Sequence, residues 1–397
     1  MLNNLQNYKP ELMSTPPTTL PKQRLIFIDL LRGLAAIWMI ETHLVNSFLN
    51  DQYRSGWLYN TVSISNGFVA VCFIFCAGAG FWIAASRKVE EYKKFASPLW
   101  LYLKRLGFIL AAAYWAHFPE FSFWRIIRST PEQVLSILQC DVLHCIVYSS
   151  LIALILVLIL PKKTPLVWVF GLLALCVFFA TPLIWGLEIF QMMPVFPGTL
   201  FARQSISPFP LFPWSGYFFA GATVTGLFMH AKDQKQFAKW LIIASVLSPI
   251  IIFIIKDLPF QYPGWQDWWF ASPGHALFRT SGIVAAFGLL YLLEGFLRRF
   301  QRVSDLLLLC GQESLFIYLL QGMLIYGTVA NVGIKHFLPT IVTPFEIVIL
   351  TAAIVAVCYS LAHIWHHYKE VNPARARRTL FMLSVLFLVV FFLVPAK

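Results

Sequence analysis

Apolar runs long enough to cross a lipid bilayer recur along almost the whole chain. A transmembrane helix needs about 20 predominantly apolar residues, because each residue adds 1.5 Å to its length. The segments that satisfy this requirement are 25–49, 64–85, 99–117, 134–160, 165–186, 208–230, 239–256, 277–297, 305–330, 342–366 and 377–395. The pattern therefore predicts an all-α polytopic membrane protein of about eleven transmembrane helices.

The distribution of lysine and arginine supports this segmentation and orients the chain. If the N-terminus is cytoplasmic, the alternating loops place 21 of the 30 Lys and Arg residues on the cytoplasmic side and 7 on the far side. Cytoplasmic loops of membrane proteins carry such an excess of positive charge. A missed or extra helix would reverse every later loop, so we predict a cytoplasmic N-terminus and an extracytoplasmic C-terminus.

Composition excludes an ordinary soluble domain. The chain is 59% hydrophobic and 12% charged, whereas soluble domains carry about 25% charged residues. The net charge of +12 follows from the cytoplasmic loops and indicates contact with anionic lipid rather than with nucleic acid. We predict a polar, Pro-rich cytoplasmic tail over 1–23, without a signal peptide, followed by a single membrane domain over 24–397.

The first apolar segment contains four ionisable residues, Asp29, Arg32, Glu41 and His43. Arg32 and His43 are eleven residues apart, which is 20° past three full helical turns, so they share a face about 16.5 Å apart along the axis. Asp29 lies one turn before Arg32 on that face, whereas Glu41 points to the opposite side. Intramembrane ionisable residues are usually functional, although Asp29 and Arg32 could equally be a structural ion pair.

Other polar residues in apolar segments are weaker candidates. Asp141 and His144 are three residues apart and would share a helix face. His117 and Arg279 lie at predicted far-side helix ends, and Glu313 and Gln321 lie in the ninth segment. Each alone is more typical of a hydrogen bond between helices than of a catalytic group. The three histidines at the end of the tenth segment, His363, His366 and His367, have no second ligand cluster, so we predict no metal. The seven cysteines all lie in apolar segments, where they behave as small hydrophobic residues.

Several motifs resemble one family of membrane acyltransferases. The opening "RLIFIDLLRGLAAIWMIETH" resembles proteins related to heparan-α-glucosaminide N-acetyltransferase and, more distantly, the type 3 acyltransferases. Further matches follow in chain order: "FIFCAGAGFWIAASRK", "DVLHCIVYSSLIALIL", "FPLFPWSGYFFAGATVTGLF", "LFRTSGIVAAFGLL" and "GQESLFIYLLQGMLIY". The resemblance covers nearly the whole chain and also implies eleven helices. It departs at Gln321, where relatives often have histidine; an amide can hydrogen-bond but cannot carry a proton.

The resemblance implies transfer of an acyl group, usually acetyl, from cytoplasmic acetyl-CoA to a sugar hydroxyl or amine of an extracytoplasmic glycan. His43 would act as general base or as a transient acyl carrier, Arg32 would hold the donor, and Asp29 would orient Arg32. In the basic second cytoplasmic loop, Lys104 and Arg105 would contact CoA phosphates. Asp141, His144, Arg279 and Gln321 would support the site. The expected location is the bacterial cytoplasmic membrane; the oligomeric state stays open, with a homodimer as one possibility.

Two other functions remain open at this stage. A proton-coupled secondary transporter would also place Asp, Arg, Glu and His within the membrane. Transporters, however, commonly show internal repeats and broken spans at matching positions, and the segment lengths show neither. A catalytically inactive relative that acts as a scaffold is the third possibility, because of Gln321.

Overall fold

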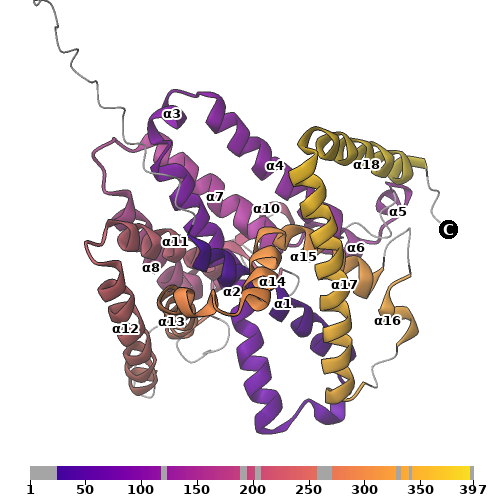
Figure 1. Cartoon of the computed structure of the whole chain (residues 1–397), viewed down its shortest axis with the longest axis horizontal. Coiled ribbons are helices and arrows are strands. Elements are labelled where there is room, and N and C mark those ends of the chain that lie inside the picture. Colours follow the sequence, from indigo (N-terminus) through magenta and orange to yellow (C-terminus); the bar gives the residue numbers. More distant parts are fainter. Residues whose placement is uncertain are drawn as a thin grey trace, which may run out of the picture.

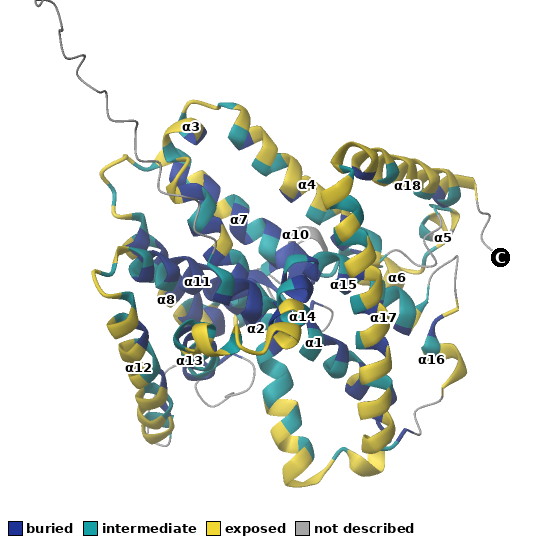
Figure 2. Ribbon diagram, viewed as in Figure 1, coloured by how far each residue is buried: buried dark blue, intermediate teal, exposed yellow. Residues whose placement is uncertain are grey.

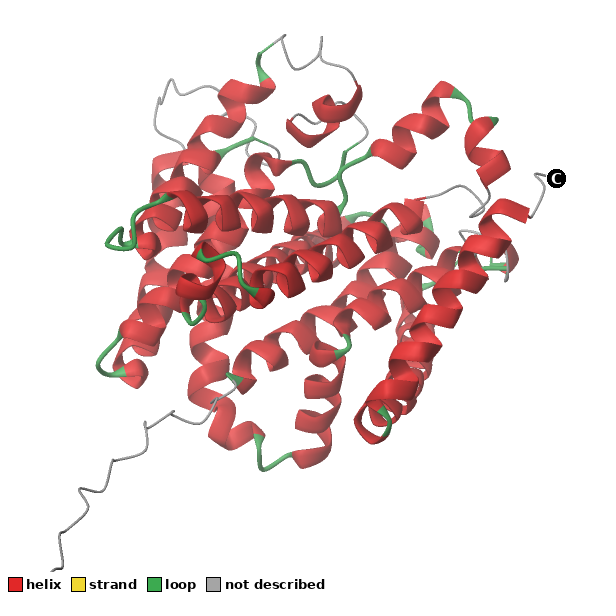
Figure 3. Cartoon of the chain, turned by 90° about the horizontal axis from the view of Figure 1, so that it is seen from above, coloured by secondary structure: helices red, strands yellow, loops and turns green. Residues whose placement is uncertain are grey.

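The computed structural model describes residues 25–117, 123–187, 195–201, 207–256, 271–327, 332–338 and 342–393. The described residues form helices joined by loops, without a strand (Figures 1 and 3). The long helices are α1 (Ile26–Phe48), α2 (Gly56–Ser86), α4 (Ser97–His117), α7 (Val142–Ile159), α8 (Leu166–Trp185), α11 (Leu211–His230), α12 (Gln234–Lys256), α13 (Pro273–Leu297), α14 (Gln301–Gln312), α15 (Ser314–Tyr326), α17 (Pro344–Val371) and α18 (Pro373–Leu393). The shorter ones are η1 (Asp51–Tyr53), α3 (Val89–Lys93), α5 (Phe123–Ile127), α6 (Pro131–Leu138), α10 (Val195–Phe201) and α16 (Ile334–Phe337).

Each of the eleven predicted segments contains at least one long helix, but not all of these helices meet a strict criterion for a membrane span. Seven are long and apolar enough to cross a bilayer, namely α2, α7, α8, α12, α13, α17 and α18. An eighth is possible if α14 and α15, which meet at a bend of 83°, form one broken span. The remaining three, α1, α4 and α11, are less apolar. The described residues therefore support a multi-pass membrane protein, while the count of eleven stays a prediction. The predicted tail over 1–23 lies outside them.

Two predicted segments differ in detail from the observed helices. The fourth segment, 134–160, divides into α6 and α7, because Asp141 caps the start of α7 instead of lying inside a helix. Aspartate is a favoured N-cap residue, since its side chain can accept hydrogen bonds from the first free backbone N–H groups. The ninth segment, 305–330, is interrupted between α14 and α15 at Glu313. The first interruption lies beside the candidate site, whereas the second lies beside Arg32 of α1.

Glycines let the central helices approach backbone to backbone. A Cβ atom added at Gly33 of α1 would lie 1.8 Å from the carbonyl oxygen of Leu307 on α14, and one at Gly311 would lie 2.0 Å from that of Asp29. The same close approach joins α2 to α11 at Gly78 and Gly221. Small residues at helix interfaces are typical of membrane proteins, where packing rather than water exclusion drives helix association. These contacts fix α1 and α2 in the middle of the molecule.

The peripheral helices expose apolar side chains rather than polar ones. Figure 2 shows α12, α17 and α18 largely exposed, whereas α1, α11 and the C-terminal half of α2 are mostly buried. Trp240, Phe345 and Phe381 on the outer helices are 58%, 73% and 70% exposed. An apolar surface of this extent suits contact with lipid tails and not with water.

Candidate active site

A cavity of about 510 Å³ lies where α1, α2, α11, α13 and α15 meet. His43 is part of its wall. Aromatic rings and uncharged polar groups make up much of the rest, among them Tyr59, Phe209, Trp214, Asn46, Asn66 and Ser63. Its size is within the usual range for small-molecule sites, about 300–1,000 Å³. The cavity can therefore hold a polar ligand with apolar faces.

Gln321 of α15 fixes the orientation of the His43 ring. The amide Nε2 of Gln321 donates to the backbone oxygen of Tyr318 at 3.2 Å, which directs the amide oxygen toward His43. That oxygen lies 2.9 Å from Nδ1 of His43. An amide oxygen only accepts, so Nδ1 of His43 carries the proton and Nε2 keeps the lone pair. The arrangement holds the imidazole in the tautomer in which Nε2 can act as a base.

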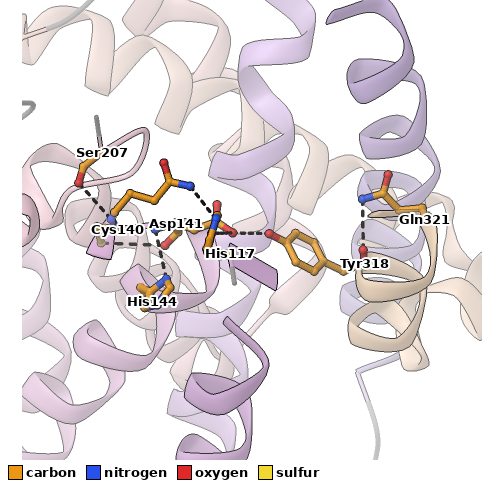
Figure 4. Close-up of polar contacts among 8 residues, drawn as sticks. His117, Cys140, Asp141, His144, Ser207, Tyr318 and Gln321 are labelled. Atoms are coloured by element: carbon orange, nitrogen blue, oxygen red, sulfur yellow. Dashed lines mark hydrogen bonds and ion pairs between the residues drawn. The ribbon is translucent and has the colours of Figure 1, made fainter. Parts of the chain in front are cut away.

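A second polar cluster is centred on Asp141 at the start of α7 (Figure 4). Its Oδ2 accepts a hydrogen bond from the hydroxyl of Tyr318, and Nε2 of His117 lies 3.4 Å from the same oxygen. Gln139 Nε2 donates to Nδ1 of His117 at 2.6 Å, which leaves the His117 proton on the nitrogen that faces Asp141. Tyr318 thus links Asp141, by its hydroxyl, to Gln321, by its backbone oxygen. The side chains from α4, α7, α15 and α1 form one connected polar network beside the cavity.

Arg279 of α13 is the arginine on the cavity wall among the described residues. Its guanidinium carbon lies 5.8 Å from the centre of the Trp214 ring, a cation–π distance. Tyr217 is its other polar neighbour. The sequence prediction that Arg279 and His43 belong to one site agrees with this common cavity, although their roles stay predictions.

Arg32 and Asp29 lie apart from the cavity, further along α1. Arg32 Nη1 is 3.6 Å from Asp29 Oδ1, as the one-turn spacing predicts. Its Nη2 donates to the hydroxyl of Ser314 at 2.7 Å, at the first residue of α15. The polar stripe of α1 therefore contacts α15 twice, through Arg32 with Ser314 and through His43 with Gln321.

The remaining sequence candidates do not line the cavity. His144 accepts from the backbone N–H of Asp141 at 3.3 Å, so this pair acts first as a capping box for α7 and not as two groups on one helix face. Lys104 and Arg105 are exposed on α4. His366 pairs with Glu313 at 2.7 Å, and His367 is exposed. No group of three or more His, Cys, Asp or Glu side chains within the described ranges is placed to hold a metal ion.

Comparison with known proteins identifies the family. A family model described as heparan-alpha-glucosaminide N-acetyltransferase, catalytic, matches residues 24–260, which is more than half of the chain. The chain belongs to this family. A search of the curated proteins found no match. The matched region includes Arg32, His43 and Asp141, whereas Arg279, Tyr318 and Gln321 lie beyond it. Family membership and the apolar helices together identify a multi-pass membrane enzyme of the acetyltransferase type.

Sequence reasoning did not identify Tyr318 and Gln139, which complete the network. Tyr318 precedes Gln321 by three residues and so shares its helix face, which is a local signal for a joint role. Gln139 carries no such signal, because its contact with His117 joins positions 22 residues apart.

Proposed function

We propose that the protein transfers an acetyl group from cytoplasmic acetyl-CoA to a hydroxyl or amine of an extracytoplasmic glycan. The single observation that carries the proposal is the contact of the Gln321 amide oxygen with Nδ1 of His43, a residue that lines a cavity suited to a polar ligand. From this contact we infer that Nε2 of His43 is unprotonated. Membership of the N-acetyltransferase family supports the reaction type. The aromatic cavity wall supports a sugar, since apolar sugar faces pack against aromatic rings.

The chemistry assigned to His43 is general base catalysis. The acceptor oxygen or nitrogen attacks the thioester carbonyl carbon while Nε2 of His43 takes its proton. The C–S bond then breaks, the acetyl group stays on the acceptor, and the imidazolium returns the proton to the departing CoA sulfur. Gln321 keeps Nδ1 as the proton donor throughout and therefore does not need to carry a proton itself. The departure from histidine at this position is compatible with activity.

We assign Arg32 to the donor side of the reaction. It lies three helical turns from His43, a distance of about 16.5 Å that suits an extended pantetheine arm. Asp29 and Ser314 hold the guanidinium from two sides. An arginine fixed in this way can present its remaining N–H groups to an anionic group of the donor. Lys104 and Arg105, exposed on α4, are secondary candidates for the phosphates.

The test is CoA release from acetyl-CoA by the purified protein, measured by chromatography with and without an envelope-glycan extract. His43→Ala is compared with His367→Ala, which removes an exposed histidine of α17. We expect glycan-stimulated release in wild type and in His367→Ala, and a loss of at least about 100-fold in His43→Ala, the usual contribution of a general base. Release that persists in His43→Ala would remove this residue from the mechanism. Absence of release together with acetyl-CoA-independent solute uptake in proteoliposomes would favour the transporter.

The acyl-carrier alternative has a distinct signature. The lone pair on Nε2 of His43 could attack the thioester directly and form an acetyl-imidazole before the acceptor arrives. Labelled acetyl-CoA incubated without acceptor would then label the protein in amounts equal to the CoA released. We expect no such label when His43 acts only as a base.

A further inference from the structure

Arg279 stands out among the half-buried arginines of the described residues because no carboxylate lies within ion-pair distance of it. The other half-buried arginines of the described residues, Arg32 and Arg54, each have an acidic neighbour, Asp29 and Asp51 respectively. Arg279 instead has the Trp214 ring at 5.8 Å and the Tyr217 side chain. Neither group neutralises the positive charge, so an anionic partner is absent from the described part of the protein.

On the described cavity wall, the carboxylate that is present is engaged by other groups. Asp141 is the acidic residue of the described wall, and its Oδ2 is already engaged by Tyr318 and faces His117. A partly buried guanidinium is stabilised chiefly by a hydrogen-bonded anion. A wall with an uncompensated arginine is thus complementary to a ligand that brings its own negative charge.

Gly67 of α2 provides the space that the guanidinium occupies. A Cβ atom at this position would lie 2.5 Å from Nη2 of Arg279. The absence of a side chain at Gly67 therefore determines where the guanidinium can rest, between α2 and the Trp214 ring. Replacing Gly67 with alanine would therefore displace the Arg279 guanidinium while its positive charge stays on the protein.

We propose that Arg279 binds an anionic group, a carboxylate or a phosphate, on the sugar acceptor, so that the enzyme prefers acidic over neutral sugars. The planar guanidinium can bind either group with two parallel hydrogen bonds. Trp214 lies against the guanidinium, and other aromatic residues of the wall, such as Tyr59, can pack against the sugar ring. This inference rests on the proposed function and specifies its acceptor.

The test uses pairs of small acceptors that differ in one charged group: glucosamine with glucosamine 6-phosphate, and methyl glucoside with methyl glucuronide. Two quantities are measured for each: kcat/KM for CoA release, and equilibrium binding to the protein without acetyl-CoA, followed by tryptophan fluorescence. The variants are Arg279→Gln and Gly67→Ala. Arg298→Gln is the matched control, since it removes an exposed arginine near the end of the same helix.

We expect wild type and Arg298→Gln to prefer the charged member of at least one pair by about tenfold or more, as for a hydrogen bond to a charged group. The pair that shows the preference identifies carboxylate or phosphate. Arg279→Gln should bring the ratio close to one, and Gly67→Ala should reduce it by displacing the guanidinium. Arg279→Lys should retain part of it, because a lysine keeps the charge but not the planar fork.

Equal use of charged and neutral sugars by wild type, or a preference that survives in Arg279→Gln, would overturn the assignment. Arg279-dependent binding of adenosine 3′,5′-bisphosphate in place of the sugars would also overturn it, because Arg279 would then bind the phosphates of the donor. Transfer to all four sugars without regard to charge refutes the anion site and leaves the acetyltransferase intact. Arg279-dependent binding of the charged sugars without any CoA release refutes the acetyltransferase and leaves the anion site intact.

Discussion

Replacing Gln321 with leucine tests the role assigned to its amide in catalysis. Gln321 is 1% exposed and makes two contacts, with Nδ1 of His43 at 2.9 Å and with the backbone oxygen of Tyr318 at 3.2 Å. Leucine has a similar size to glutamine but can make neither of these two hydrogen bonds. Nδ1 of His43 then has no acceptor on α15, and the imidazole can rotate or move its proton to Nε2. Rotation would turn the Nε2 lone pair away, and a proton shift would remove it, so both changes would impair the proposed base.

The size of the effect follows from the cost of an unpaired donor. Leaving a buried donor without its partner costs about 1–3 kcal/mol, and 1.4 kcal/mol is a factor of ten in rate. We therefore expect Gln321→Leu to lower kcat by about 5- to 150-fold. The KM for acetyl-CoA should change little, because Arg32 and Ser314 are separate from this contact.

Gln321→Glu is the matched variant. A carboxylate still accepts from Nδ1 of His43 but cannot donate to the Tyr318 carbonyl when ionised. It should keep kcat within about tenfold of wild type, since only one hydrogen bond worth about 0.5–1.5 kcal/mol is lost. The assay is CoA release under saturating acetyl-CoA, with thermal unfolding in detergent measured on the same samples. A Gln321→Leu protein that unfolds earlier but keeps the wild-type kcat would refute the tautomer argument and leave Gln321 a packing residue.

Two further substitutions probe the framework around the site. Gly33→Ala should lower the free energy of unfolding by about 1–3 kcal/mol, the usual cost of overpacking, because its Cβ would lie 1.8 Å from the Leu307 carbonyl oxygen. Gly295→Ala is the control, because a Cβ at that position meets nothing within 4 Å. It should not destabilise the protein in the same thermal assay. Tyr318→Phe removes the hydroxyl that donates to Asp141 and should lower the free energy of unfolding by about 1–3 kcal/mol. The measurement is thermal unfolding in detergent. An unchanged unfolding temperature would mean that solvent replaces this contact.

The helices were accessible from the sequence because each depends on a local property. A run of about 20 apolar residues forms a helix in a bilayer, since every backbone polar group must then bond within the segment. The pairing of Asp29 with Arg32 was equally local, as the observed 3.6 Å separation shows. The common face of Arg32 and His43 also followed from helical geometry alone, and both residues contact α15.

The composition of the cavity was less accessible, because it depends on contacts between distant segments. Gln321 meets His43 across 278 positions, and Tyr318 meets Asp141 across 177. No periodicity within one segment encodes such a pair. The sequence alone marks Gln321 as a departure from histidine that cannot carry a proton, whereas the structure places its amide oxygen beside Nδ1 of His43.

The interruption between α14 and α15 is the feature that brings these distant residues together. Hydropathy predicts one span over 305–330, but the chain turns by 83° at Glu313. Glu313 is held there by Lys369 at 2.6 Å and His366 at 2.7 Å on α17. The next residue, Ser314, contacts Arg32, and the redirected α15 then carries Tyr318 to Asp141 and Gln321 to His43. A continuous helix would keep the direction of α14 and could not make all three contacts, so the contacts of Lys369 and His366 with Glu313 at the bend help to bring these residues together.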